Sequence, residues 1–412
     1  MFILIQNFYN IVRANKEVIT NQFYNTLRFV LSVLISMASI KLITSYLDPE
    51  QFGIYRYVLS VAGICRITIM TGVGKILSGY VRREYHGSVQ ESTLLSFKTG
   101  SLGVLVLVMF GFYSLIETQN RVESILFFVS AAVFLPYYIF PRFEFILGGL
   151  EKFKEILLFR IGSKIILISA ALIVLVLFDQ GILIYGISQL VLASFLFALL
   201  FIYSKRQLSN DKVDLGFKRH SFMISLIALG SVITVPGIQV YLKSSIGITE
   251  LAYFVVATSI STRITAVVKP IIQPVTLKIM KNTKNRYRSY VIKLTLPMLF
   301  FGLFLYLILY MSIDTFGQYI VSKEYEISLL YAKLLGIVII LAPLYSLYNS
   351  YVVFEKLNKA FSVSLYSNQL ATIIGYVLFV DKFGVKAIAF SNLAAVFVSI
   401  VVMAYSILRD KE

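Results

Sequence analysis

Eight Lys and Arg residues interrupt stretches of sequence that are otherwise apolar and long enough to cross a membrane. An ionisable side chain inside a bilayer costs roughly 2.5–3.5 kcal/mol on insertion scales, so a functional role is its default interpretation. A group of such cations suits a diphosphate, because Arg offers paired donors to phosphate oxygens and Lys a point charge. The predicted diphosphate-binding residues are Arg28, Arg66, Lys164, Arg263, Arg160, Arg56, Lys41 and Lys243.

Depth divides these cations into two groups. Arg28, Arg66, Lys164 and Arg263 are the deeper four, and Arg28 lies about 9 Å into its span at 1.5 Å per residue. The other four, Arg160, Arg56, Lys41 and Lys243, lie nearer a membrane boundary. Snorkelling of a long side chain to the interface is the competing explanation for those four.

Other residue types offer little chemistry within the spans. Glu144 is a weak candidate for ion coupling, against the alternative of a charge at the cytoplasmic end of its span. Pro236 is a candidate hinge, because proline removes a backbone hydrogen bond and kinks a helix. One cysteine and two histidines exclude an internal disulfide and a His-rich metal site. Lys75 follows Gly74 as in a phosphate-binding loop, but the glycine required five positions before that pair is Ile69. We therefore predict no cofactor, no metal site and no nucleotide-driven step.

Composition sets the fold class. Hydrophobic residues make up 58% of the 412 positions and charged residues 14%, with a mean hydropathy of +0.82. A soluble domain is about a quarter charged, so lipid must be the solvent for most of this chain. A span needs about 20 apolar residues, and the pattern predicts an all-α polytopic membrane protein with about twelve spans. These are 22–46, 53–72, 93–116, 122–147, 156–178, 181–204, 221–246, 250–272, 290–313, 327–354, 358–380 and 384–408.

The connectors between these spans alternate in charge. One set carries 22 Lys and Arg residues, Arg142 among them, and the other carries four. Short loops rich in Lys and Arg stay in the cytoplasm, which predicts that both termini are cytoplasmic. The net charge of +17 is then a topology signal facing anionic lipid. Because the basic residues are scattered over small loops, the charge argues against nucleic-acid binding.

The two halves of the chain resemble each other. Glu151-Lys152-Phe153-Lys154 before the fifth span matches Glu355-Lys356-Leu357-Asn358 before the eleventh, and prolines interrupt both the fourth and the tenth span. An even number of spans separates the copies, so an axis along the membrane normal relates them. Transporters are often built from such repeats, with the substrate site at the repeat interface. We expect an interfacial lead-in at 1–20, six-helix bundles at 21–204 and 221–408, and a basic cytoplasmic linker at 205–220.

The segment Leu47-Asp48-Pro49-Glu50-Gln51-Phe52-Gly53-Ile54-Tyr55 resembles the signature of polysaccharide flippases. Those proteins belong to the multidrug/oligosaccharidyl-lipid/polysaccharide (MOP) exporter superfamily. The resemblance implies a bacterial inner-membrane flippase that carries an undecaprenyl-diphosphate-linked O-antigen or capsule repeat unit to the outer leaflet, by alternating access through a cationic cavity. It also implies polymerase and chain-length proteins of the same glycan pathway as candidate partners, beside the membrane lipids.

Two other functions compete with this hypothesis. The first is export of drugs or of a peptidoglycan precursor, but drug and cation antiporters of the superfamily usually need a buried carboxylate, and the first span has none. The second is a membrane glycan polymerase, which needs a sizeable outer loop with catalytic residues. The longest outer connector predicted here, 314–326, is about a dozen residues long and has no histidine. A transporter rather than an enzyme is therefore expected.

Overall fold

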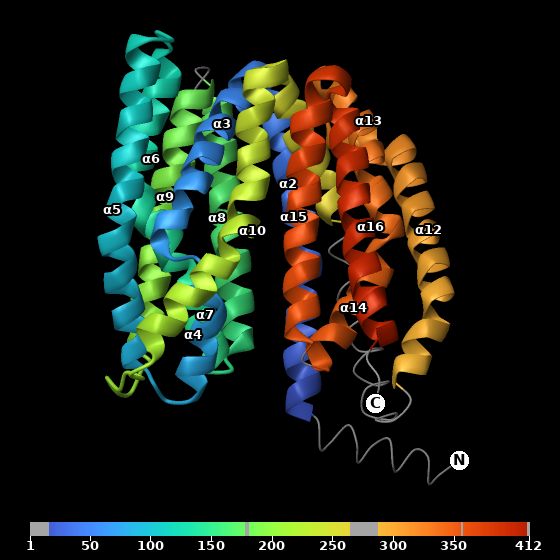
Figure 1. The fold of residues 1–412 in the computed structure, drawn as a ribbon. Coiled ribbons are helices and arrows are strands. Elements are labelled where there is room, and N and C mark those ends of the chain that lie inside the picture. The colour runs from blue at the N-terminus through green and yellow to red at the C-terminus, as the bar shows by residue number, and fades with distance from the viewer. Residues whose placement is uncertain (1–15, 178–180, 264–286, 356, 410–412) are drawn as a thin grey trace. The chain divides into compact units, whose positions relative to one another are not determined.

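The computed structural model describes residues 16–177, 181–263, 287–355 and 357–409, and all regular structure in these ranges is helical (Figure 1). Helices dominate because lipid offers no partner to an open backbone N–H or C=O group. The α-helices are α2 (Lys16–Tyr46), α3 (Pro49–Cys65), α4 (Val73–Arg82), α5 (Gly87–Ile116), α6 (Arg121–Ile139), α7 (Phe143–Gly149), α8 (Phe153–Leu177), α9 (Gly181–Lys205), α10 (Phe217–Ile246), a helix over 248–263, α12 (Tyr287–Ile320), α13 (Glu326–Gly336), α14 (Ala342–Phe354), α15 (Asn358–Phe383) and α16 (Val385–Arg409). Four short 3-10 helices are η1 (Arg66–Ile69), η2 (Phe140–Arg142), η3 (Lys323–Tyr325) and η4 (Ile337–Ile340).

The chain is a multi-pass membrane protein. Within the described residues nine helices are long and apolar enough to cross a bilayer, or ten if the bent pair Lys323–Ile340 and Ala342–Val353 forms one span. Each of the twelve predicted spans falls on a helical segment, although the one at 250–272 is described only as far as Arg263. The predicted all-α polytopic fold class is confirmed. Most of the predicted lead-in at 1–20 lies outside the described residues, since α2 begins at Lys16.

The helices pack into two compact units. Unit 1 comprises residues 1–39 and 65–229, and unit 2 comprises residues 40–64 and 230–412. The chain passes from one unit to the other within α2, at the C-terminal end of α3, and within α10. This grouping describes packing and does not test the predicted division of the repeat at 205–220, which stays a prediction.

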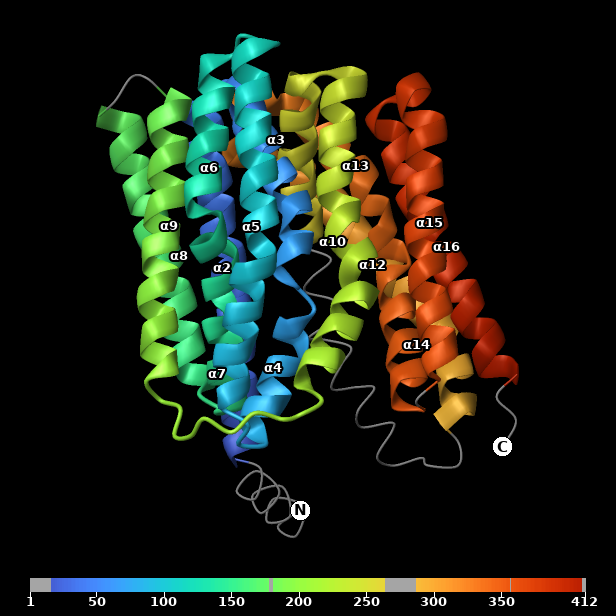
Figure 2. The same cartoon turned by 60° about the vertical axis from the view of Figure 1, so that its left-hand side comes forward.

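Unit 1 is built around α5, α6, α8 and α9. Helix α5 lies beside α6, and α8 lies beside α9 (Figure 2). Two helix breaks, at η1 and at η2, lie against this group. The helix that starts as α3 changes to the 3-10 helix η1, and Met70 then adopts a left-handed backbone conformation with φ 52° before α4 begins. The helix α6 likewise passes through η2 into α7, at a break that contains Pro141. A core of Val73, Leu77, Phe143, Ile146 and Phe201 joins α4, α7 and α9 below the breaks.

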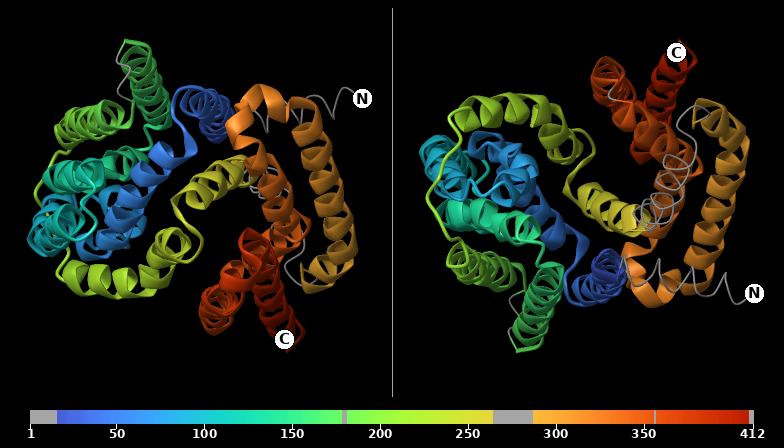
Figure 3. Two further views of the ribbon diagram at one scale, coloured as in Figure 1. Left: turned by 90° about the horizontal axis from the view of Figure 1, so that it is seen from above. Right: turned by 90° about the horizontal axis from the view of Figure 1, so that it is seen from below.

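Unit 2 has its tightest packing between α15 and α16, which lie side by side (Figure 3). Its helix α12 packs on α14 and η4, and Leu344, Leu347 and Met403 form part of the core there. The segment α13–η4–α14 bends by 41°. The predicted proline interruption of the tenth span is visible in this bend, because Pro343 stands in the first turn of α14.

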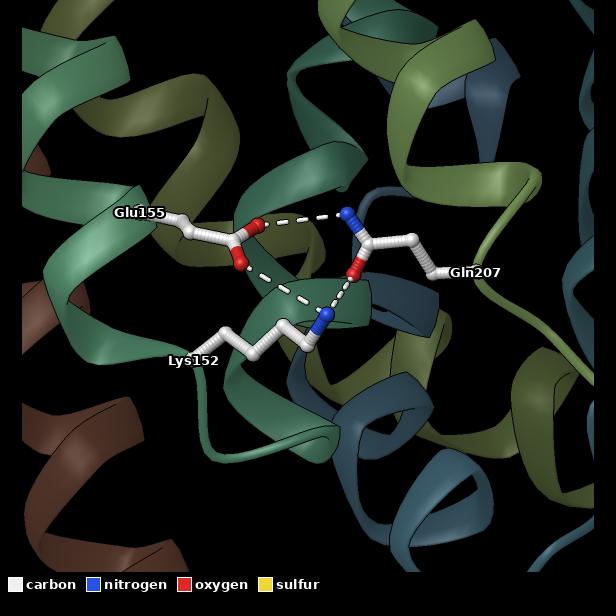
Figure 4. A network of polar contacts seen from close by, with 3 residues as sticks. All are labelled: Lys152, Glu155 and Gln207. Carbon is white, nitrogen blue, oxygen red and sulfur yellow. Dashed lines mark hydrogen bonds and ion pairs between the residues drawn. The ribbon is translucent and has the colours of Figure 1, made fainter.

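The segment between α9 and α10 is fixed to one end of unit 1. Gln207 bonds to Lys152, and its Nε2 donates to Glu155 Oε2 at 3.2 Å, while Lys152 Nζ lies 3.5 Å from Glu155 Oε1 (Figure 4). Further along, the Ser209 N–H donates to His86 Nδ1 at 3.2 Å. The segment crosses below α7 and α4 in Figure 2, and α10 begins at Phe217, inside the predicted linker.

The far end of the same segment is held by an aromatic contact. Phe217 is fully buried and packs edge-on against Tyr80, with ring centroids 5.0 Å apart. The Tyr80 hydroxyl lies 2.9 Å from His220 Nδ1. Burial, followed by the charge of Asp214, raises the pKa of Tyr80, so its hydroxyl stays protonated at neutral pH. The linker between α9 and α10 is therefore an ordered part of unit 1 and not a free tether.

Candidate functional site

Three charged side chains in unit 1 form a cluster that we call the cationic triad: Arg28 on α2, Glu144 on α7 and Arg160 on α8. Arg160 Nη1 donates to Glu144 Oε2 at 2.5 Å, and the two side chains are 42% and 25% exposed. Arg28 is half-buried and interacts electrostatically with both partners. The triad therefore contains two guanidinium groups and one carboxylate, which leaves it with a net positive charge.

Local structure explains where each member of the triad lies. The break at η2 starts a new helix at Phe143, so Glu144 stands in the first turn of α7, where the helix dipole favours a carboxylate. Arg160 lies about two turns into α8, which begins at Phe153. Glu144 was predicted to be either a coupling residue or a charge at the end of its span. The structure pairs it with a predicted substrate cation, which neither interpretation included.

Arg66 is the first residue of η1 and faces an aromatic ring of α6. Its guanidinium carbon lies 5.9 Å from the ring centroid of Tyr138, within range of a cation–π contact. The buried Nε of Arg66 has no hydrogen-bond partner among the described residues. A planar, partly unsatisfied guanidinium is a suitable donor for an incoming phosphate oxygen. Lys164, the fourth predicted cation of unit 1, is half-buried one turn after Arg160 on α8.

Arg142 was missed by the sequence interpretation, which counted it among the cytoplasmic connector charges. The structure corrects this, because the side chain is 4% exposed inside unit 1. Its Nη1 donates to Ser92 O at 3.0 Å, and its Nη2 donates to Ile69 O at 2.8 Å and to Ser96 Oγ at 2.7 Å. The available signal was its place directly after Pro141, at a helix break.

In unit 2, two predicted cations lie where α3 packs on α10. Lys243 Nζ lies 3.5 Å above the ring centroid of Tyr57. One turn away, the buried Ser60 hydroxyl donates to Gln239 Oε1 at 2.5 Å. Arg56 is half-buried near Tyr57 on α3, and its buried Nε has no hydrogen-bond partner among the described residues. The structure therefore brings Lys243 to the helix that carries Arg56.

The remaining predicted residues of unit 2 are more dispersed. Lys41 is exposed on α2, and Arg263 is half-buried at the end of the described part of its helix. Pro236 lies inside α10, and a Cβ added to Gly63 of α3 would meet its ring at 3.0 Å. That approach explains a glycine in α3, while the hinge role of Pro236 stays a prediction.

Comparison with known proteins agrees with this arrangement of helices. Residues 18–280, more than half of the chain, match the profile of the family described as "Polysaccharide biosynthesis protein". The chain belongs to this family. The resemblance to polysaccharide flippases that we found in the sequence is confirmed. No curated protein sequence matches the chain.

Solved structures show the fold of this family member. The lipid II flippase MurJ, in an inward closed conformation, is similar with a TM-score of 0.70 at 14% identity, over 95% of this chain and 87% of that chain. A MATE protein in complex with MaD3S gives a TM-score of 0.65 at 13% identity, over 94% and 96% of the two chains. An inward-facing multidrug resistance MATE family transporter of the MOP superfamily gives 0.63 at 12% identity, over 92% and 94%. At these identities the likeness establishes the fold alone. The family and the fold both agree with the expectation of a flippase or transporter.

Proposed function

We propose that this protein flips an undecaprenyl-diphosphate-linked oligosaccharide repeat unit, of an O-antigen or a capsule, from the cytoplasmic to the outer leaflet of a bacterial inner membrane. The observation that carries the proposal is the cationic triad. Arg28 and Arg160 are two arginines of unit 1 that both interact electrostatically with a single carboxylate, that of Glu144. A diphosphate supplies the negative charge that this cluster lacks, with oxygens that match guanidinium geometry.

The triad suits the loading step. The charge pattern of the connectors predicts that the end of unit 1 carrying α7 and the start of α8 faces the cytoplasm, where a lipid-linked repeat unit is assembled. A diphosphate headgroup entering there meets Arg28 and Arg160 first. Glu144 holds Arg160 in place until a phosphate oxygen replaces its carboxylate. The same carboxylate competes for the arginine afterwards and so promotes release of the headgroup.

The other predicted cations extend the same chemistry to further positions in the spans. Arg66, Lys164, Arg56, Lys243, Lys41 and Arg263 are the further residues proposed to bind the diphosphate during transfer. Arg66 and Lys243 each lie over a tyrosine ring, a contact worth about 0.5–2 kcal/mol. A ring face carries no formal negative charge, so an incoming anion does not have to displace an anionic partner from the Arg66 guanidinium.

The test is a deletion strain assayed for lipid-linked repeat units held in the inner leaflet. We expect the deletion to accumulate them, the wild-type gene to restore surface glycan, and Arg28→Ala and Arg160→Ala to restore little at equal membrane levels. Lys154→Ala, an exposed cation at the start of α8, is the matched control and should complement fully. Full complementation by both triad variants would refute the role of the triad.

The same strain separates the alternative functions. A deletion that changes only drug tolerance would identify an efflux protein. Growth of MurJ-depleted cells rescued by this chain would identify a peptidoglycan precursor as the cargo. Both outcomes contradict a glycan repeat unit as the main substrate, although the second retains a diphosphate-linked lipid.

A further inference from the structure

The environment of Arg142 differs from that of the other intramembrane cations. It is nearly fully buried, and each of its three hydrogen bonds among the described residues goes to a neutral acceptor: Ile69 O, Ser92 O and Ser96 Oγ. Bonds to a charged donor are the stronger class of hydrogen bond, and a buried charge is tolerated only when it is well bonded. A residue held in this way is immobile and is not positioned to exchange partners with a substrate.

One of the acceptors is the carbonyl that the helix break exposes. Ile69 ends η1, and Met70 then takes a left-handed conformation, so the Ile69 carbonyl lacks a regular helical partner. Arg142 Nη2 and the Ser96 hydroxyl, which donates at 2.9 Å, both bond to it. Breaks of this kind are stable in a membrane only where side chains satisfy the freed backbone groups.

Packing reinforces the same hold on η1. A Cβ added to Gly103 of α5 would lie 2.7 Å from Thr68 Oγ1, and one added to Gly100 would lie 2.9 Å from Ile69 Cγ2. The two glycines let α5 approach η1 closely enough for Ser96 to reach it. The break is therefore fixed from α5 and from η2 at the same time.

We propose that Arg142 is a positioning residue that fixes η1 and thereby presents Arg66, the first residue of η1, to the diphosphate. The role given to Arg66 rests on the proposed function. The hold of Arg142 on η1 does not depend on it. Arg66 lies three residues before Ile69, so one turn of 3-10 helix joins the fixed carbonyl to the substrate cation. Freeing Ile69 would let η1 and the Arg66 guanidinium move away from Tyr138.

The single cysteine of the chain reports on this hold. Cys65 directly precedes η1 and is 7% exposed. We expect Arg142→Gln to make Cys65 react about ten- to a hundredfold faster with a small methanethiosulfonate reagent, the range expected from loss of charged hydrogen bonds. Arg142→Lys should give a smaller increase, because one ammonium group cannot span the separated carbonyls. Arg82→Gln, which removes an exposed guanidinium from α4, should leave the rate unchanged.

Ser96→Ala removes the second donor to Ile69 O and provides a milder variant should Arg142→Gln fail to insert. It should raise the Cys65 reaction rate about threefold. Unchanged Cys65 reactivity in both correctly inserted variants would overturn the proposed hold on η1.

Flipping of a fluorescent undecaprenyl diphosphate carrying one N-acetylhexosamine, measured in proteoliposomes, supplies the second measurement. If Arg142 acts through Arg66, the double variant Arg142→Gln/Arg66→Ala should flip no more slowly than Arg66→Ala alone. If the reductions in flipping rate caused by the two substitutions multiply in the double variant, Arg142 acts independently of Arg66 and the positioning role is overturned. If Cys65 becomes reactive in Arg142→Gln but Arg66→Ala flips at the wild-type rate, the hold on η1 stands and the diphosphate role of Arg66 fails.

Discussion

The substitution Glu144→Gln tests how the triad binds and releases an anion. The change keeps the shape of the side chain but removes the charge that neutralises Arg160 at 2.5 Å. Because the Arg160 side chain is 42% exposed, the ion pair contributes about 1 kcal/mol, the upper end of the range for exposed pairs. An incoming phosphate no longer has to displace it, so binding should strengthen by roughly fivefold. The Glu144 carboxylate also competes with phosphate for Arg28, so its loss raises the expected gain in binding toward tenfold.

The assay is flipping of the fluorescent lipid diphosphate in proteoliposomes, with its concentration varied. We expect the KM of Glu144→Gln to fall by about five- to tenfold, and kcat to fall too, because headgroup release slows when no carboxylate competes for Arg160. Glu155→Gln makes the same chemical change on α8, where the partner is Lys152, and should leave KM unaltered. An unchanged or higher KM for Glu144→Gln at normal membrane levels would refute displacement of the ion pair by substrate.

Two further predictions concern the deep cations and the packing of unit 2. Arg66→Ala and Arg263→Ala should lose most glycan export while inserting normally, and wild-type export by both would exclude them from the path. Gly53→Ala should lower the stability of the detergent-solubilised protein by about 1–3 kcal/mol, because the new Cβ would lie 2.3 Å from Ile248 O. Thermal unfolding measures this loss. Gly79→Ala, where a Cβ would meet nothing within 4 Å, is the control and should not destabilise.

The helices were predictable because the bilayer imposes a strong constraint on sequence. Only a helix satisfies its own backbone over an apolar stretch of about 20 residues, so hydropathy alone located the helical segments. Prolines marked the interruption at Pro141 and the one at Pro343. The break at η1 had no such marker, since its residues, Arg66 to Ile69, contain neither proline nor glycine. That break depends on contacts with α5. Because α5 lies further along the chain, the residues next to the break give no sequence signal of it.

The cations were predictable as a set but not by partner. Sequence depth ranked Arg160 as a boundary residue, whereas the structure gives it the clearest ionic contact of the predicted cations in unit 1. Arg142 was assigned to a connector because it stands at the end of a span, two residues before Glu144. The helix break at η2 turns the side chain into the bundle instead. Burial of a terminal residue depends on the path of the backbone, which residue spacing on a straight helix does not reveal.

The chemical nature of each partner separates cations that hold the fold from cations suited to transport. Arg142 bonds to backbone carbonyls and a serine, and displacing them would open η1 and α5. Arg160 bonds to a carboxylate, which another anion can replace without opening a helix. Arg66 lies against a ring and retains an unsatisfied buried Nε. A flippase has to release what it binds, and bare arginines in a low-dielectric site would hold a diphosphate too strongly to let it leave. The carboxylate and the ring therefore belong to the transport chemistry as much as the arginines do, because they weaken the grip on the headgroup enough for it to pass on.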